Sequence, residues 1–211
     1  MDVLSLIEDN GRGCAARAAN VLRTGGVILY PTDTLYGLGA DALSDVAVEK
    51  VYSIKGREEG KPMHAIVADL EMAGRYGEID DRVRLLAQKF PKGKITFVVK
   101  KKAGANTGIV RDGNTFGFRI PDNEFCIAML RAFDGPITAT SANKSGEAPE
   151  SSVEKILEQL GASAEGIALA IDGGAISGGL ASSVVDLSAG EVRILREGAI
   201  PAVEIKKALE H

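Results

Sequence analysis

The sequence predicts an α/β fold, a single domain over residues 1–211 with a twisted, mixed β-sheet covered by helices. Helical and strand-like segments alternate over most of the chain, which favours a sheet with helices on its faces. Two strand-like segments near the end are separated by only four residues, 188–191, which favours a local antiparallel pair. Hydrophobic residues make up 45% and charged residues 26%, a balance typical of compact globular proteins.

The first part of the chain alternates between helical periodicity and short apolar runs. Capping residues and glycines bound the helical segments, and runs of β-branched residues mark the strands. We expect helices at 14–23, from Asp45 to 55, from Asp69, and from Asp80 or Asp81 to 90, with strands at 27–30, 65–67 and 95–99.

The second part continues the alternation and ends in the candidate hairpin. Residues 116–120 alternate in the manner of a strand and Pro121 closes it, while Pro201 opens a C-terminal helix. The remaining patterns predict helices at 124–133 and about 153–160, and strands at 137–140, 168–171, 184–187 and 192–195.

Composition excludes several classes of protein. No stretch approaches the roughly 20 apolar residues that span a bilayer, and the N-terminus lacks the blocks of a signal peptide, so a cytoplasmic location is expected. The isolated Cys14 and Cys126 are expected to be reduced packing residues. A net charge of −4 and few aromatic residues argue against broad nucleic-acid binding.

Four polar or basic segments lie beside the predicted strands and helices, where open α/β sheets place ligands. Taken alone, each has a second interpretation: a turn tied by its own side chains, a basic helix end, a capping loop or a flexible loop. Only the third segment, 138–146, is favoured as a binding site, because it directly follows an apolar strand. The segments are 31–39 (PTDTLYGLG), 55–61 (KGREEGK), 138–146 (TATSANKSG) and 172–183 (DGGAISGGLASS).

Arg119 and Arg196 each end an apolar strand. A guanidinium group in that position is suited to a carboxylate or a phosphate, because its N–H groups form a planar fork. The same position is equally typical of a salt bridge at the rim of a sheet.

In order, these segments resemble the YrdC-like threonylcarbamoyl-AMP synthase family along nearly the whole chain. The opening motif is 31–39, and Lys55, Arg57, Ser141 and Asn143 match the family's basic and Ser-x-Asn signature. Further matches are 118–121 (FRIP), 172–174 (DGG), 182–186 (SSVVD) and 195–198 (LREG).

The resemblance implies an L-threonylcarbamoyladenylate synthase with a concave, positively lined cavity. Such an enzyme makes threonylcarbamoyl-AMP and pyrophosphate from L-threonine, bicarbonate and ATP, for the N6-threonylcarbamoyladenosine of tRNA. It implies Mg²⁺ with the ATP, bound by ligands that the sequence does not identify, and transfer of the product to a tRNA threonylcarbamoyltransferase complex.

The resemblance also assigns residues. Lys55 and Arg57 are the expected catalytic pair, and Lys55 and Asn143 should line the cavity. The residues expected to bind ATP are Arg57, Lys61, Thr115, Ser141, Asn143 and Arg196, and those expected to hold L-threonine are Thr34, Arg119, the backbone at Ala139, and Ser182.

Three features depart from the family pattern. Some relatives carry a histidine where this chain has Ile66, and no ligand role is carried over to His64. Lys61 stands where some members have asparagine. The sequence shows no counterpart of the C-terminal extension domain of longer members.

Two other functions stay open at this point. One is a non-enzymatic RNA-binding module, which the concave basic surface implied by the resemblance suggests. The other is a paralogue that acts on another carbamoyl adenylate or lacks synthase activity.

Overall fold

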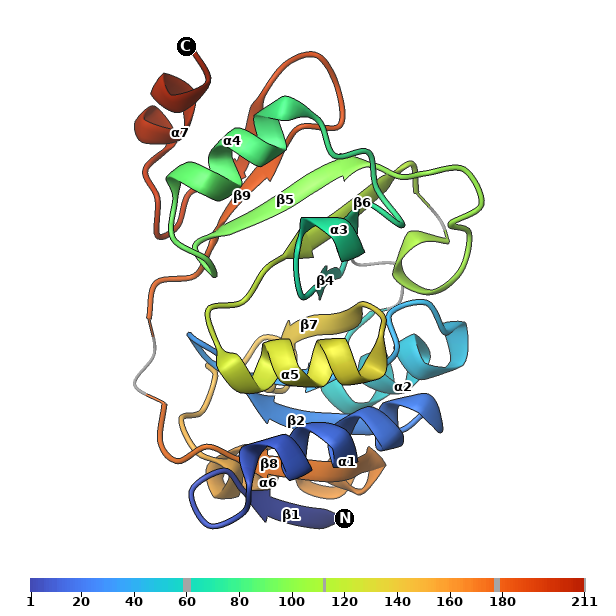
Figure 1. Ribbon diagram of the computed structural model, residues 1–211. Helices are drawn as coiled ribbons and strands as arrows, with labels where there is room; N and C mark the ends of the chain where they lie inside the picture. The colour runs from blue at the N-terminus through green and yellow to red at the C-terminus, as the bar shows by residue number, and fades with distance from the viewer. Residues whose placement is uncertain (59–61, 112, 177–178, 211) are drawn as a thin grey trace.

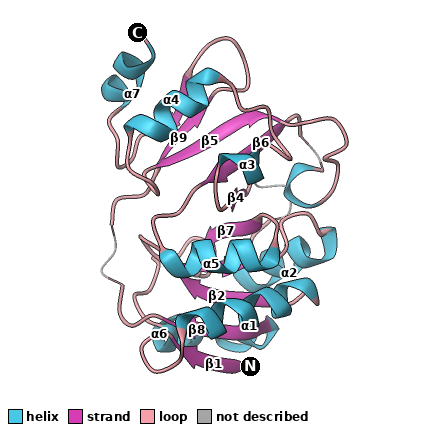
Figure 2. Cartoon of the chain, in the orientation of Figure 1, coloured by secondary structure: helices cyan, strands magenta, loops and turns pink. Residues whose placement is uncertain are grey.

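A computed structural model describes residues 1–58, 62–111, 113–176 and 179–210. Ten strands form one continuous mixed sheet, in the order β1-β8-β2-β3-β7-β4-β6-β5-β9-β10 (Figures 1 and 2). The strands are β1 (Asp2–Ser5), β2 (Val27–Pro31), β3 (Tyr36–Gly39), β4 (His64–Ile66), β5 (Ile95–Lys100), β6 (Thr115–Arg119), β7 (Ile137–Ser141), β8 (Ile167–Asp172), β9 (Ser183–Asp186) and β10 (Arg193–Arg196).

The sheet contains both parallel and antiparallel pairs. Strand β8 runs parallel to β1 and β2, while β4 runs parallel to β6 and β5 to β9. The antiparallel pairs are β2/β3, β3/β7, β4/β7, β5/β6 and β9/β10. The expected mixed sheet and the expected terminal hairpin of β9 and β10 are both confirmed.

Seven α-helices and two short 3-10 helices connect the strands in the described part of the chain. They are α1 (Gly11–Arg23), α2 (Asp45–Lys55), α3 (Leu70–Ala73), α4 (Asp81–Lys89), α5 (Glu124–Phe133), α6 (Val153–Leu160) and α7 (Ala202–Leu209), with η1 (Gly108–Val110) and η2 (Gly161–Gly166). Helices α1 and α5 lie side by side over one face of the sheet (Figure 1).

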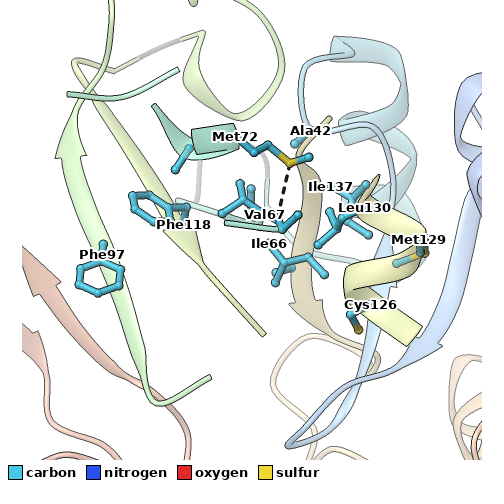
Figure 3. Packing of buried hydrophobic residues seen from close by; sticks show 14 of the residues in the cluster. Ala42, Ile66, Val67, Met72, Phe97, Phe118, Cys126, Met129, Leu130 and Ile137 are labelled. Atoms are coloured by element: carbon cyan, nitrogen blue, oxygen red, sulfur yellow. Dashed lines mark hydrogen bonds between the residues drawn. The ribbon is translucent and has the colours of Figure 1, made fainter. Parts of the chain in front are cut away.

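Strand β2 shows how alternation divides the core. Ile28 and Tyr30 pack with the helices α1 and α5, whereas Val27 and Leu29 pack with α2 and α6 on the opposite face. Figure 3 shows the first of these layers, where Leu130 of α5 lies beside Ile137 of β7. This half of the sheet is therefore covered on both faces.

The other half of the sheet is covered on only one face near the cavities. Phe97 of β5 and Phe118 of β6 pack into the helix-covered core with ring centroids 5.3 Å apart, and Figure 3 shows the two rings together. Thr96 and Gly117, which precede these two residues in their strands, lie on the opposite face and line an open cavity. Strand alternation thus creates both the core and the floor of the candidate site.

Two strands were not expected from the sequence. Strand β1 is a short edge strand, and β3 lies within the segment 31–39 that was interpreted as a loop. A Cβ atom at Gly37 or Gly39 would lie 2.9 or 2.8 Å from the ring of Tyr30. The glycines of β3 therefore make room for a buried aromatic ring on β2, although glycine is a poor strand former.

One expected cap is wrong by one residue. Ser44, not Asp45, caps α2, because its side chain accepts a hydrogen bond from the amide of Ala47. Asp45 instead accepts a hydrogen bond from the amide of Gly108 at 2.7 Å. The caps at Asp69 and Asp80 are confirmed, and Cys14 and Cys126 are free and buried as expected. Among the described residues, no helix combines the length and apolarity that crossing a membrane requires.

Candidate active site

An inner cavity of about 300 Å³ opens where β2, β3, β4, β6 and β7 meet. Hydroxyl, guanidinium and aromatic side chains dominate its wall. The lining residues used below are Tyr30, Thr34, Arg57, His64, Arg119, Ala139, Ser141, Ser182 and Arg196.

An outer cavity of about 540 Å³ adjoins the inner one. The two share four residues, Pro62, Met63, His64 and Arg196. The outer wall is more apolar and includes Val48 and Tyr52 of α2, together with Thr115 of β6. The pair of cavities forms one elongated site with a polar inner end.

The turn between β2 and β3 shapes one side of the inner cavity. The amide of Thr32 donates to the carbonyl of Leu35 at 3.1 Å, and the Thr32 hydroxyl donates to the same oxygen at 2.7 Å. The Thr32 hydroxyl also accepts hydrogen bonds from the amides of Thr34 and Leu35. This local network presents Thr34 to the cavity.

Arg119 lies at the end of β6 and is held by a buried acid. Its Nη1 atom lies 2.8 Å from Oδ1 of Asp33, and the side chains are only 8% and 7% exposed. The same nitrogen lies 3.3 Å from the carbonyl oxygen of Gly93. Arg119 is therefore a buried ion-pair partner that also faces the inner cavity, rather than a residue of an exposed rim.

Arg196 and Ser182 come together from β10 and from the residue before β9. The Arg196 guanidinium donates through Nη2 to the Ser182 carbonyl at 2.8 Å. The Ser182 hydroxyl lies 2.7 Å from that of Thr96 on β5. These bonds fix two of the expected binding residues on the wall of the inner cavity.

Lys55 and Asn143 do not line either cavity, which corrects the expectation from the sequence. Lys55 is 2% exposed, and its Nζ donates to the carbonyl of Ser141, to the carbonyl of Asn143 at 2.8 Å and to Oδ1 of Asn143 at 3.1 Å. The Ser141 hydroxyl also donates to Oδ1 of Asn143. An ammonium group has three N–H donors, and all three are used here. Lys55 and Asn143 thus support the turn that carries Ser141.

Arg57 follows the left-handed Gly56 that ends α2, whose φ is 57°. Its Nη2 donates to the carbonyl of Pro62 at 3.0 Å, while its buried Nε has no hydrogen-bond partner among the residues that the structure describes. The guanidinium lines the inner cavity. A buried donor without a partner lowers the stability of the folded protein, so this nitrogen is suited to an acceptor on a ligand.

His64 lies on the wall shared by the two cavities, a position that the sequence did not reveal. It pairs with Ala139 of β7 across the sheet. Burial, together with the charges of the nearby guanidinium groups of Arg119, Arg196 and Arg57, lowers the pKa of His64 to about 3. The imidazole is therefore neutral at physiological pH. A polar residue at the start of a short apolar strand was the available signal.

The residues expected from the sequence separate into four groups. The inner cavity brings together Thr34, Arg57, Arg119, Ala139, Ser141, Ser182 and Arg196. Thr115 lines the outer cavity, Lys55 and Asn143 lie behind Ser141, and Lys61 falls outside the described residues.

The described side chains contain no group of three or more His, Cys, Asp or Glu residues arranged to hold a metal ion. A magnesium ion bound mainly through the phosphates of a nucleotide and water does not require such a group. The described residues therefore offer no protein cage dedicated to a metal ion.

Fold and cavity together define an α/β protein with a site for small molecules that carry carboxylate or phosphate groups. A family model for Sua5, YciO and YrdC, described as telomere recombination, matches residues 20–198. The chain belongs to this Sua5/YciO/YrdC family.

A Pyrococcus abyssi protein named threonylcarbamoyl-AMP synthase is 33% identical over 193 residues, covering 91% of this chain and 56% of that protein. The crystal structure of P. abyssi Sua5 complexed with L-threonine matches with a TM-score of 0.85 and 30% identity over 99% of this chain and 60% of that one. E. coli YciO matches with a TM-score of 0.80 and 28% identity over 97% of both chains. The chain therefore spans little more than half of the P. abyssi protein.

Proposed function

We propose that this chain is a threonylcarbamoyl-AMP synthase, a nucleotidyltransferase that converts L-threonine, bicarbonate and ATP into threonylcarbamoyl-AMP and pyrophosphate. The observation that carries the proposal is the convergence of Arg57, Arg119 and Arg196 on one cavity of a protein whose net charge is −4. The likeness to a Sua5 structure complexed with L-threonine supports it.

In this proposal the inner cavity receives the amino acid. The Arg119 nitrogens that are not bonded to Asp33 bind the threonine carboxylate, and Thr34 and Ser182 bind its remaining polar groups. The cavity volume of about 300 Å³ is at the small end for ligand sites, which suits an amino acid beside part of a nucleotide.

The nucleotide spans the two cavities. Arg57 and Arg196 neutralise its phosphates at the inner end, Ser141 contacts it from the β7 turn, and Thr115 contacts it in the outer cavity. Magnesium supplies further neutralisation of the phosphates when it is bound.

The chemistry needs no covalent enzyme intermediate. The threonine amine takes up carbon dioxide derived from bicarbonate and loses a proton, and an oxygen of the resulting carbamate attacks the α-phosphorus. The bond between the α-phosphorus and the oxygen that bridges it to the β-phosphorus breaks, and pyrophosphate leaves. The protein's contribution is to position the two anions and to stabilise the charge that develops between them.

The mixed anhydride formed in this way is reactive towards water. We therefore include its transfer to a tRNA threonylcarbamoyltransferase complex in the proposal, together with a cytoplasmic location, where that complex meets tRNA. Direct binding of tRNA has weak support, since the chain carries 29 acidic and 25 basic residues.

The test is pyrophosphate release by the purified chain with ATP, magnesium and bicarbonate, with each amino acid in turn. We expect release with L-threonine, and none when threonine or bicarbonate is omitted. Release that depends on another amino acid would favour a paralogue. Salt-sensitive RNA binding without any pyrophosphate release would favour the RNA-binding module.

A further inference from the structure

We propose that Asp33 is a positioning residue for the amino-acid site. Asp33 holds one nitrogen of the Arg119 guanidinium, so that the other nitrogens face the substrate carboxylate. The inference rests on the proposed function and deepens it. Asp33 belongs to the segment 31–39 of the family signature, but the resemblance assigned it no role in the site.

The contacts of Arg119 carry the first step. Nη1 donates to Oδ1 of Asp33 at 2.8 Å and to the carbonyl of Gly93 at 3.3 Å. Within the described part of the chain, Nε and Nη2 of Arg119 make no hydrogen bond. Arg119 lines the inner cavity, whereas Asp33 does not, so the acid approaches the guanidinium from behind.

The second step concerns the orientation of Asp33. Its other oxygen, Oδ2, is buried and accepts no hydrogen bond from any described residue. That oxygen packs against Gly93, where a Cβ atom would lie 2.1 Å from it. Leaving a buried carboxylate oxygen unpaired costs stability, and such exceptions concentrate at functional sites. The carboxylate is held by packing in the orientation that serves Nη1.

Two effects of Asp33 on substrate affinity have opposite signs. Its negative charge offsets that of Arg119 and weakens the attraction to a substrate carboxylate, so loss of this charge alone would tighten binding. Its hydrogen bond fixes the guanidinium, so loss of this bond misaligns the fork and weakens binding. The direction of the change therefore distinguishes positioning from simple charge compensation.

Calorimetric titration of L-threonine and, separately, of ATP tests the inference. For Asp33→Ala we expect threonine affinity to fall by at least about 10-fold, with ATP affinity within about 2-fold of the unmodified chain. Asp33→Asn keeps an oxygen acceptor for Nη1 and should stay within about 3-fold of the unmodified chain. Asp33→Leu, whose side chain has a similar size but no acceptor, should lose threonine affinity as Asp33→Ala does. It replaces Asp33→Ala in the test if the alanine variant does not fold.

Asp80→Ala is the matched control for lost stability. It removes a cap of α4 and an ion pair with Arg82 at a distance from the cavities, so threonine affinity should not change. Unchanged or tighter threonine binding in Asp33→Ala, or equal loss in Asp33→Asn and Asp33→Leu, overturns the positioning role. If the unmodified chain binds no threonine, the proposed function fails and this inference fails with it.

Discussion

The ammonium nitrogen of Lys55 lies 2.8 Å from the carbonyl oxygen of Asn143, so a buried cation at the end of α2 supports the turn that follows β7. The bond joins residues far apart in the sequence. It also explains why the lysine of the sequence signature lies behind the cavity wall and not on it.

Replacement of Lys55 by methionine should separate support of the turn from overall stability. We expect pyrophosphate release to fall at least about 10-fold, because Ser141 loses its fixed position. The free energy of unfolding should fall by only about 1–2 kcal/mol, since removal of a buried charge partly offsets the lost hydrogen bonds. Urea unfolding and steady-state kinetics measure the two effects.

Lys50→Met is the matched control on the same helix. Lys50 is exposed and its Nζ donates to a single carbonyl, that of Gly25, at 2.7 Å. Activity should be unchanged. Equal losses of activity in both variants would contradict the supporting role of Lys55.

The pH dependence of activity should reflect Lys55. Burial and the charge of Arg57 lower the pKa of Lys55 to about 8. Above that pH the neutral amine has only two N–H donors for three acceptors, so pyrophosphate release should decline as pH rises above about 8. A profile that stays flat to pH 9.5 would contradict this.

The lowered pKa of Lys55 should make stability rise with pH, whereas activity declines. The unfolded lysine keeps its proton up to its ordinary pKa of 10.5, so between about pH 8 and 10.5 the unfolded chain binds more protons than the folded one. The contribution of Lys55 to the free energy of unfolding should therefore increase with pH in this window. Urea titrations of the unmodified chain and Lys55→Met at pH 7.5 and 9.5 measure it.

Gly93→Ala should destabilise the protein and disturb the amino-acid site. Gly93 has φ 77°, and the added Cβ would lie 2.1 Å from Oδ2 of Asp33. We expect a loss of about 3 kcal/mol or more in the free energy of unfolding, from backbone strain and the displaced ion pair. Gly104→Ala, with φ 93° but open space around it, should show the strain alone. Equal losses in the two variants would exclude a role for the Asp33 contact.

Loss of Arg57 should impair the proposed reaction more than the fold. Arg57→Ala removes a guanidinium from the inner cavity, and we expect a loss of roughly 2–5 kcal/mol of binding or transition-state stabilisation, measured as the ratio kcat/KM for ATP. Arg75→Ala, which breaks an exposed ion pair with Asp134, serves as the control. Turnover of Arg57→Ala at the unmodified rate would remove Arg57 from the phosphate site.

His64 should not titrate in the physiological range. Its folded pKa of about 3 lies below its ordinary value of 6.5, so its ring-proton NMR shifts should stay constant from pH 8 to 5, while those of the urea-unfolded chain change near 6.5. As pH falls from 6.5 towards 3, the unfolded chain gains a proton that the folded chain does not, and stability should decline. A folded-state midpoint near 6.5 would show that His64 is not buried among the guanidinium groups.

Local patterns predicted those elements whose ends are set by local chemistry. The helix 124–133 has the expected bounds, because Asn123 caps its start and the left-handed Asp134 follows its end. The helix 153–160 likewise begins after the capping Ser152. Strand β3 was not predicted, because its glycines have a low strand propensity. They are present to make room for the Tyr30 ring on the neighbouring strand, a contact that local sequence patterns do not indicate.

The candidate site was predictable in its residues but not in its layout. Strand-end positions and the ordered signature identified Arg57, Arg119 and Ser141, which line one cavity. His64 escaped because its place on the shared wall depends on the pairing of β4 with β7, which brings it opposite Ala139. Which side of a strand faces a cavity depends on such pairing.

The sequence by itself determined most of the helix caps, most of the strands, the reduced cysteines and the set of polar residues from which a binding site is built. Only the tertiary structure decided that Asp33 binds Arg119 and that Lys55 lies behind Ser141. The physical reason is that caps and alternation are interactions between near neighbours in the chain, whereas these contacts depend on strand order and register across the sheet.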